Sequence, residues 1–415
     1  MNKSRSLITI PGLIIFAALL TGLGWGSYHF AQKNISGEGF IIQWIGINSL
    51  VADGQDPYSN LVTAQIQENV KFENTFAVSN PPKYTSPLYS GIVVFPFAII
   101  GNRTISRALW LAAQLLAIIL IQLLAIKLTG WKPAWYLLMI FSLFTMFSYH
   151  VFIPWIDGGL SIWAALFLVL ALLAIHNNWN EVGGIFLALA AIQPQMVILV
   201  IIFTLIWAAS QRKKILVLWF FITMIFISVI GILLVPNWVM QYIKLIYNYP
   251  ANFPSGNPEA LFIDLWPGLG KQLGWVVTGL AGIVLGVEWW QARKRDFRWF
   301  LWTVCLTLAL SQWIGIPTIP GNFTGLILPL ILVSTMLTEH WPLGGKWVAV
   351  FMVMVLFIWE WAIFYLDIIS FQVGMQLNLL IPLPLISIIG LYWVRWWAIK
   401  PRRLLIEELR FGEIY

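Results

Sequence analysis

Charged residues are scarce in this sequence, and cysteine is almost absent. Of the 415 residues only 10% are charged, whereas 60% are hydrophobic. A soluble domain of this length needs a larger charged surface, so the composition excludes a soluble globular protein. The single cysteine, Cys305, excludes an intrachain disulfide and a metal site built from several cysteines. The sequence also lacks a Gly-rich phosphate loop and the His spacing of metalloproteases, which excludes those two enzyme classes.

Most of the sequence consists of long apolar runs. They predict an all-α polytopic membrane protein with about 12 transmembrane helices of roughly 20 residues. The 25 Trp residues fit this class, because Trp favours the membrane–water interface. The run 86–101 is short enough to dip into the membrane without crossing it, and Pro194 interrupts the run 182–209. The expected spans are 7–30, 86–101, 107–128, 133–153, 158–176, 182–209, 214–235, 270–289, 299–316, 323–337, 347–369 and 377–397.

Lys and Arg lie in small clusters between the apolar runs. This distribution is typical of cytoplasmic loops, and it argues against nucleic acid as the reason for the net charge of +7. If every cluster faces the cytoplasm, both termini are cytoplasmic. The single cysteine suits a bacterial inner membrane, so we expect a multi-pass protein of the cell inner (plasma) membrane. The side of the loops between Arg107 and Arg212 depends on whether 86–101 crosses. The clusters are Lys3/Arg5, Arg103/Arg107, Arg212–Lys214, Arg293–Arg298 and the tail from Arg395 to Arg410.

Two polar stretches fall on the outer side in this count. The first, 31–85, is acidic and contains a turn signal at 53–57; within it, 40–50 and 58–70 are predicted to form surface-lying helices. The second, 236–269, is rich in aromatic residues, Pro and Asn. Loops of this length commonly carry function. We expect one integral membrane domain, 1–415, with further spans in 86–235, C-terminal spans in 270–397 and a cytoplasmic tail, 398–415.

Short motifs occur in a fixed order from this first loop through most of the chain. In this order they resemble the GT-C glycosyltransferases, and more narrowly the family 87 transferases that use polyprenyl-phosphate mannose. The resemblance implies a GT-C-like fold that moves a hexose, usually mannose, with inversion from a polyprenyl phosphate to a lipid or glycan acceptor on the outer face. It implies no cofactor and no required divalent metal. The motifs are Phe40-Ile41-Ile42-Gln43-Trp44; Gly54-Gln55-Asp56-Pro57-Tyr58-Ser59, like the family's GxDPY segment; Pro81-Pro82 through Phe95-Pro96-Phe97; Gly158-Gly159; Gly183-Gly184 leading to Gln193-Pro194-Gln195; and Pro320-Gly321-Asn322 ahead of Leu326-Ile327-Leu328-Pro329.

The sequence departs from this family at the expected catalytic base. Relatives have an Asp directly before the Phe of the first outer loop, whereas this chain has Gly39 there and Glu38 one residue earlier. Inverting transfer needs one carboxylate to deprotonate the acceptor hydroxyl. We therefore expect Glu38, Asp56 or Asp53 to be the base, or catalysis to have been lost. Asp53 and Asp56 have the competing interpretation of turn residues.

Six further residues are predicted to contact substrate, or to have ordinary structural roles instead. Tyr58 could stack on a sugar, and Lys83 could hold phosphate or reach the interface from an apolar surface. Gln193 replaces the Lys of the family's Lys-Pro-Gln element, with Gln195 beside it. Asn322 stands at a helix start, where it could serve anion binding or capping. Asp157, like Glu360, is an ionisable residue in an apolar run, which indicates function or a structural ion pair.

Two rival functions remain open at this point. A transporter or lipid flippase would use the intramembrane carboxylates Glu360 and Asp157, but the sequence has no internal repeat of the kind that transporters have. A catalytically inactive relative would bind a lipid-linked sugar, and Gly39 and Gln193 favour it. In all three cases membrane lipids are partners.

Overall fold

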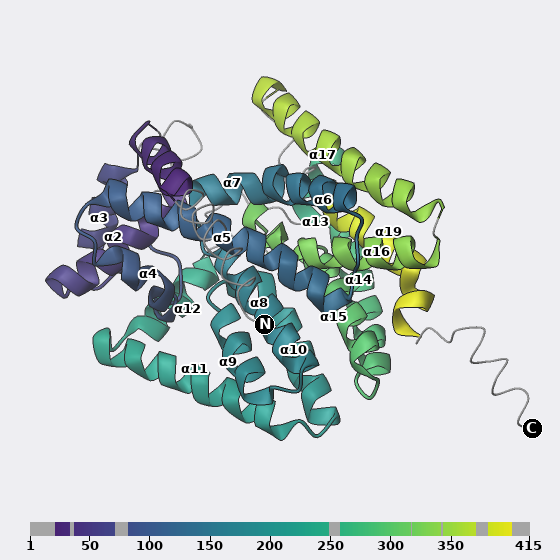
Figure 1. Cartoon of the computed structure of the whole chain (residues 1–415). Coiled ribbons are helices and arrows are strands. Elements are labelled where there is room, and N and C mark those ends of the chain that lie inside the picture. Colours follow the sequence, from purple (N-terminus) through teal and green to yellow (C-terminus); the bar gives the residue numbers. More distant parts are fainter. Residues whose placement is uncertain are drawn as a thin grey trace, which may run out of the picture. The chain divides into compact units, whose positions relative to one another are not determined.

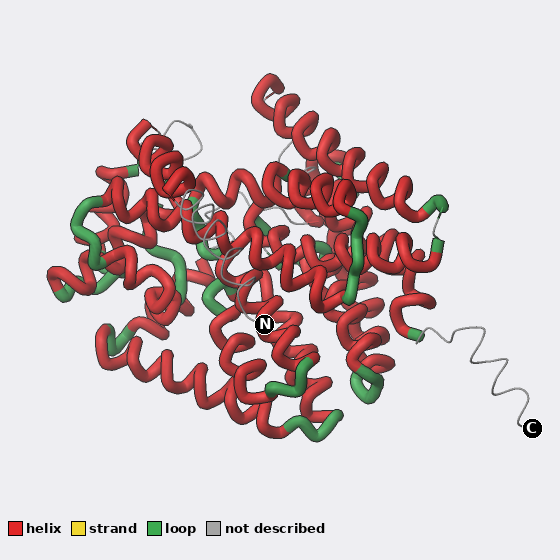
Figure 2. Tube along the Cα trace, in the orientation of Figure 1, coloured by secondary structure: helices red, strands yellow, loops and turns green. Residues whose placement is uncertain are grey.

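The computed structural model of the chain describes residues 21–33, 37–70, 82–248, 258–316, 318–341, 343–370 and 381–400. Helices make up almost all of these ranges, and none of them contains a strand (Figure 1, Figure 2). This is the structure that long apolar runs favour in lipid, because a helix satisfies its backbone donors and acceptors internally. In chain order the elements are α2 (Glu38–Asp53), α3 (Asn60–Asn69), η2 (Leu88–Ser90), α4 (Gly91–Ala98), α5 (Arg103–Thr129), α6 (Trp135–Phe147), α7 (Tyr149–Asp157), α8 (Ser161–His176), α9 (Asn180–Ala190), α10 (Pro194–Ser210), α11 (Lys214–Leu234), α12 (Trp238–Asn248), α13 (Pro258–Leu265), α14 (Gly270–Ala292), α15 (Phe297–Ser311), η4 (Pro320–Leu326), α16 (Ile327–His340), α17 (Gly345–Ser370) and α19 (Pro382–Ile399).

Six of these helical segments are long and apolar enough to cross a membrane: α5, α11, α14, η4 with α16, α17 and α19. The pair α6 and α7, bent by 47° at its break, makes a possible seventh. The all-α multi-pass membrane protein predicted from composition is therefore confirmed. Of the predicted first span, residues 21–33 are helical, and the part before residue 21 lies outside the described residues. The same holds for most of the tail, 401–415.

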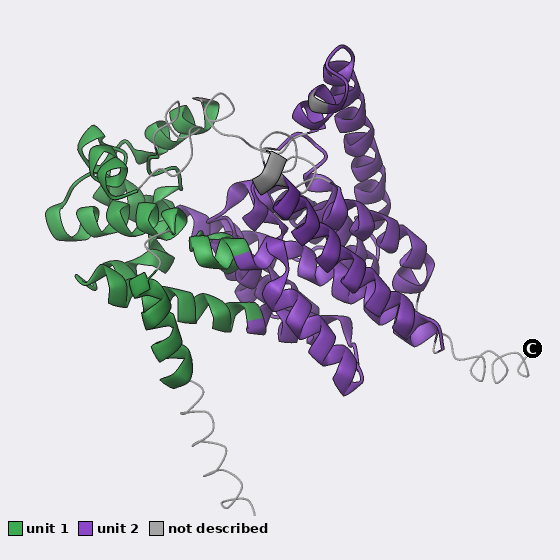
Figure 3. Cartoon of the chain, turned by 90° about the horizontal axis from the view of Figure 1, so that it is seen from above, with its two compact units in different colours: residues 1–118, 153–163, 227–253 green, residues 119–152, 164–226, 254–415 purple. Residues whose placement is uncertain are grey.

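The chain divides into two compact units (Figure 3). The first unit contains residues 1–118, 153–163 and 227–253, and the second contains 119–152, 164–226 and 254–415. The two helices predicted within the first loop are present in the first unit, as α2 and α3. The Ser59 hydroxyl caps α3 by accepting a hydrogen bond from Val62 N.

The segment 86–101 contains no helix long enough to span a membrane. Its α4 has eight residues, which corresponds to about 12 Å of helix against a hydrocarbon core of about 30 Å. The helix packs on α2 instead, and Asn48 Nδ2 donates a 2.7 Å hydrogen bond to Ala98 O at its end. Of the two alternatives for 86–101, the short α4 and its packing on α2 favour a segment that does not cross the membrane.

The run 182–209 is also not one span. It forms α9 and α10, which are separated by residues 191–193, and Pro194 occupies the first turn of α10. Lys213, after the end of α10, donates a 3.1 Å hydrogen bond to Asn178, before the start of α9. The two helices therefore form an antiparallel hairpin. Proline explains the break, since it cannot continue the hydrogen-bond ladder of a preceding helix.

Candidate active site

Helix α2 begins with a backbone donor that is satisfied by a distant carboxylate. The helix follows Gly37 and has no side-chain cap of its own. Gly39 N instead donates a 2.9 Å hydrogen bond to Asp157 Oδ1, from the end of α7. The first N–H groups of any helix need such acceptors, and the positive end of the helix dipole favours an anion there. Asp157 is thus held at the start of α2.

Gly39 has no side chain, and the Asp157 carboxylate occupies that space. A Cβ atom built on Gly39 would overlap Asp157 Oδ2 and lie 2.9 Å from Asp157 Cγ. Real Cβ atoms essentially never approach so closely. The missing side chain at position 39 is therefore what allows a carboxylate from α7 to reach the backbone of α2.

The Gly158-Gly159 pair, which follows Asp157, fixes this approach. Gly158 has a φ of +78°, and a Cβ there would lie 2.7 Å from Phe40 Cβ. Its carbonyl accepts a 2.9 Å hydrogen bond from Trp110 Nε1, and the Gly159 carbonyl accepts one of 2.7 Å from Gln114 Nε2. The turn after α7 is thus bound to α5 through two side chains and packs directly on α2.

A buried arginine completes the cluster. Arg107 of α5 has 4% of its surface exposed and interacts electrostatically with Asp157. A Cβ on Gly37 would lie 2.6 Å from Arg107 Nη2, so a second glycine makes room for the guanidinium at the start of α2. The sequence identified Arg107 only as a marker of membrane sidedness, and its position four residues inside an apolar helix was the available signal. We refer to Gly37, Glu38, Gly39, Arg107 and Asp157 as the α2-start cluster.

Of the predicted bases, only Glu38 belongs to this cluster. It is the first residue of α2 and is exposed to solvent. Asp53 is the last residue of the same helix, exposed and followed by Gly54 in the left-handed conformation. The helix has 16 residues, and at a rise of about 1.5 Å per residue Glu38 and Asp53 at its two ends lie roughly 22 Å apart.

Asp56 has the geometry of a turn residue. Its Oδ1 accepts a 2.9 Å hydrogen bond from Tyr58 N, which closes a local turn, and its Oδ2 accepts one of 2.7 Å from Gln241 Nε2 of α12. Both carboxylate oxygens thus have structural partners. This geometry agrees with the turn interpretation of Asp56.

Tyr58 and Lys83 lie near this turn rather than at the α2-start cluster. The Tyr58 hydroxyl donates a 2.7 Å hydrogen bond to Ser86 O, and its ring meets the Tyr84 ring edge-on at 5.3 Å. Burial raises the pKa of Tyr58, and the neighbouring Tyr84 adds to the shift, so the hydroxyl remains a neutral donor. Lys83 is half-buried beside the fully packed Tyr84.

The remaining predicted residues belong to the second unit. Gln193 is buried, Gln195 is half-buried, and the first turn of α10 packs on η4, where Met196 touches Gly325. Asn322, in η4, is 1% exposed, and neither atom of its amide has a hydrogen-bond partner among the described residues. The Pro-Gly-Asn element is thus a packed turn in the second unit.

A buried histidine–glutamate contact in the second unit was only half predicted. Glu360 of α17 is fully buried; its Oε2 accepts a 3.1 Å hydrogen bond from Tyr149 N, and its Oε1 lies 4.0 Å from His150 Nε2. The His150 ring packs against Phe323 at 4.6 Å between centroids. The sequence marked Glu360 because it interrupts an apolar run, but it gave no reason to pair it with His150.

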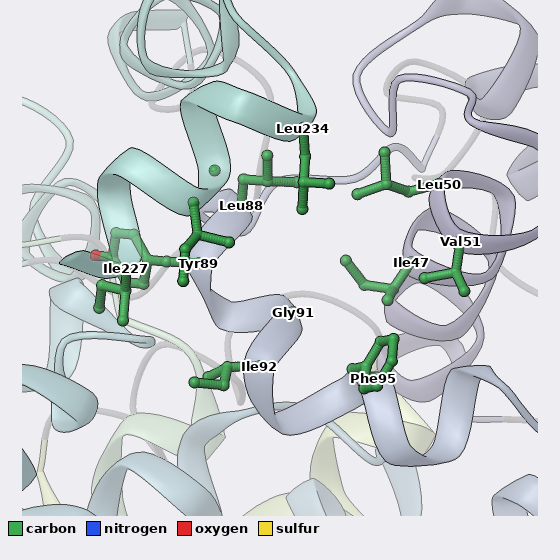
Figure 4. A pocket seen from close by; sticks show the side chains of 12 residues that line it. Ile47, Leu50, Val51, Leu88, Tyr89, Gly91, Ile92, Phe95, Ile227 and Leu234 are labelled. Atoms are coloured by element: carbon green, nitrogen blue, oxygen red, sulfur yellow. The ribbon is translucent and has the colours of Figure 1, made fainter.

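An apolar cavity lies in the first unit, along the C-terminal half of α2 (Figure 4). It has a volume of about 480 Å³ and is bounded by aliphatic and aromatic side chains from α2, η2, α4 and α11. Several of them are also exposed at its rim, including Val51, Ile92 and Leu234. The lining residues are Ile47, Leu50, Val51, Leu88, Tyr89, Gly91, Ile92, Phe95, Ile227, Ile230, Gly231 and Leu234.

In the described part of the chain, no group of three or more His, Cys, Asp or Glu side chains is placed to hold a metal ion. The α2-start cluster therefore offers two carboxylates and a guanidinium as its chemical groups. Comparison with protein families, with curated proteins and with solved structures found no match for this chain.

Proposed function

We propose that this chain is an inverting membrane glycosyltransferase of GT-C type. It would move a hexose, mannose by the family resemblance, from a polyprenyl phosphate to a lipid or glycan acceptor. The observation that carries the proposal is the position of Asp157. Its carboxylate fills the side-chain space at Gly39, the one position where the resemblance implies a catalytic Asp and the sequence lacks it.

The α2-start cluster has the groups that this reaction needs. Asp157 would accept the proton of the acceptor hydroxyl while the hydroxyl oxygen bonds to the anomeric carbon of the sugar. The bond from that carbon to the phosphate oxygen breaks at the same time, and the phosphate leaves with the electron pair. The N–H of Gly39 holds the carboxylate in position, and the nearby Arg107 guanidinium favours its charged form before the proton moves.

The apolar cavity supports a lipid-linked donor. Part of its lining comes from α11, a candidate membrane span, and the lining residues Ile230 and Leu234 also belong to the exposed apolar surface. A chain of isoprene units could enter such a cavity from the bilayer without losing contact with apolar groups. Because the cavity and the α2-start cluster share α2, both belong to one unit.

The shortness of α4 supports an outer site in an inner (plasma) membrane. Without a crossing at 86–101, the loop 31–85, Arg107 and Asp157 fall on the same side of the membrane. We place the basic clusters from Arg212 onward on the cytoplasmic side, together with both termini. We infer that the reaction takes place on the outer face.

The direct test is transfer of radiolabelled sugar by membranes that contain the protein. Polyprenyl-phosphate mannose and the corresponding glucose donor are offered with membrane lipids as acceptors, and the anomeric configuration of any product is determined. We expect a labelled lipid or glycan with the configuration opposite to that of the donor. A product with retained configuration would contradict the proposed mechanism.

The other predicted carboxylates are expected to be dispensable for transfer. Asp56→Ala removes two hydrogen bonds, so it should lower the free energy of unfolding by about 1–3 kcal/mol. Its transfer rate should stay within about threefold of the wild type, and Glu38→Ala should lower the rate by less than about tenfold, since an exposed carboxylate acts weakly at a distance. Rates are compared at equal protein levels, with melting temperatures measured in detergent. If Glu38→Ala abolishes transfer, the base is Glu38 and not Asp157.

A transporter or flippase is the second candidate, and the buried pair His150 and Glu360 favours it. Glu360→Gln distinguishes the two functions. For a transferase the substitution should change stability and leave the transfer rate of the folded fraction unaltered. Loss of lipid or sugar flux across vesicles with Glu360→Gln, in a protein without transferase activity, would support the transporter.

A further inference from the structure

Several helix ends of the second unit meet at one place. Gln211, after α10, donates a 2.7 Å hydrogen bond from Nε2 to Arg295 O, before α15. Arg298, in the first turn of α15, donates one of 3.2 Å from Nη1 to Lys400 O, directly after α19. The turns α10–α11 and α14–α15 and the end of α19 therefore lie side by side within this unit. We call this region the basic end.

The basic end contains many cations and few anions. Arg212, Lys214, Lys294, Arg295, Arg298 and Lys400 are all exposed there. Arg395 pairs with Glu288 at 2.8 Å, and Asp296 is used as the cap of α15. No ion pair to a carboxylate occurs for Arg295, Arg298 or Lys400 in the part of the chain that the structure describes. Their charges remain available to an external anion.

Exposed tryptophans stand beside these cations. Arg293 Cζ lies 3.2 Å from the ring centroid of Trp290, and Lys400 Nζ lies 3.2 Å from that of Trp396. The two rings are 67% and 62% exposed. Trp next to Lys and Arg is typical of the level of lipid headgroups, where the ring contacts acyl chains and the cation contacts phosphate.

Two buried donors at the basic end have no acceptor. Trp299 Nε1 of α15 and Arg395 Nε of α19 are both inaccessible to solvent and make no hydrogen bond within the described residues. Arg395 Cζ lies 5.9 Å from the Trp299 ring centroid, so the two donors are neighbours. Each of these atoms can only donate, and buried donors are ordinarily satisfied. The group that would satisfy both is an acceptor, and the surrounding charge favours an anionic one.

We propose that the basic end binds the headgroup phosphate of an anionic phospholipid, with Trp299, Arg395 and Arg298 as its donors. A bilayer lipid fits better than free phosphate, because the neighbouring span α14 has only 22% of its apolar window buried and offers acyl chains a surface. Anionic lipid fits better than a zwitterionic one, because Arg295, Arg298 and Lys400 have no carboxylate partner among the described residues that would pair with choline. This inference is independent of the proposed transferase activity.

The test compares retained lipids on the purified full-length chain. The protein is exchanged into mixed vesicles of phosphatidylglycerol and phosphatidylcholine, re-extracted in mild detergent and examined by native mass spectrometry. The wild type should retain phosphatidylglycerol in preference. Arg298→Gln should lower the retained ratio of the two lipids about fivefold, which is the effect of one basic group near an anionic surface.

The matched control is Lys271→Gln, which removes one exposed cation from the first turn of α14, the end of that helix opposite to Arg293. Its lipid ratio should equal that of the wild type. Trp299→Phe keeps an aromatic six-membered ring but removes the N–H donor with the pyrrole part of the indole, so it should lower the ratio even if Arg298→Gln fails to fold. Equal loss with Lys271→Gln, no lipid preference in the wild type, or displacement of the lipid by inorganic phosphate alone would each overturn the proposal.

Discussion

Asp157→Asn is expected to lower sugar transfer by about 10²–10⁴-fold, the range that a general base typically contributes. The amide keeps the size of the carboxyl group and can still accept the hydrogen bond from Gly39 N, so the fold should be retained. It cannot take the proton from an acceptor hydroxyl. The measurement is the initial rate of transfer from radiolabelled polyprenyl-phosphate mannose, at matched protein levels and with melting temperature as the control for folding.

Moving the carboxylate back to position 39 provides a sharper test. In the double variant Gly39→Asp with Asp157→Gly, the new side chain enters the space that the old carboxylate leaves, and an Asp in the first turn of a helix is favourable. We expect the transfer rate of this double variant to be at least about tenfold higher than that of Asp157→Gly alone. Gly39→Asp alone should be poorly folded, because its Cβ overlaps Asp157. An active Asp157→Asn protein would refute the assignment of the base.

Gly158→Ala is expected to have the second largest effect. Its φ of +78° disfavours any side chain by about 1–2 kcal/mol, and its Cβ would lie 2.7 Å from Phe40 Cβ, which adds about 1–3 kcal/mol of overpacking. The turn after Asp157 must then move away from α2. We expect a loss of about 2–5 kcal/mol of stability together with a large loss of transfer, measured by thermal unfolding in detergent and by the transfer assay.

Gly54→Ala is the matched control for this substitution. Gly54 also has a positive φ, of +66°, but a Cβ there would have no atom within 4 Å. It should therefore lose only the conformational part, about 1–2 kcal/mol, and keep its transfer activity. If the two variants behave alike, the contact between Gly158 and Phe40 does not hold the α2-start cluster together.

Parts of this structure followed from local sequence properties. The scarcity of charge and the length of the apolar runs are sufficient to predict a multi-pass helical protein, because lipid leaves the backbone few alternatives. The helices α2 and α3 were predictable for a similar reason, since their apolar positions and the Gly54 and Ser59 signals lie within the segments themselves. Pro194 correctly indicated a break in the run 182–209.

The direction of the chain after a break is a tertiary property. The same local geometry at a proline fits either one kinked helix or a hairpin of two helices. Only the hydrogen bond between Lys213 and Asn178 shows that the chain forms the hairpin. The run 86–101 has the composition of a membrane segment, but its α4 ends after eight residues because it packs on α2. The hydropathy of a segment indicates that its apolar surface will be buried. It does not indicate whether lipid or another helix will cover that surface.

The sequence by itself determined that this chain is a multi-pass membrane protein, that it is helical, and that position 39 is a glycine. Only the tertiary structure decided which carboxylate lies beside that glycine. Asp157 stands 118 residues further along the chain and reaches Gly39 N through a turn whose two glycines permit close backbone approach. Composition and periodicity act over a few helical turns, whereas this contact depends on how α2, α5 and α7 pack, so no local pattern could have shown it.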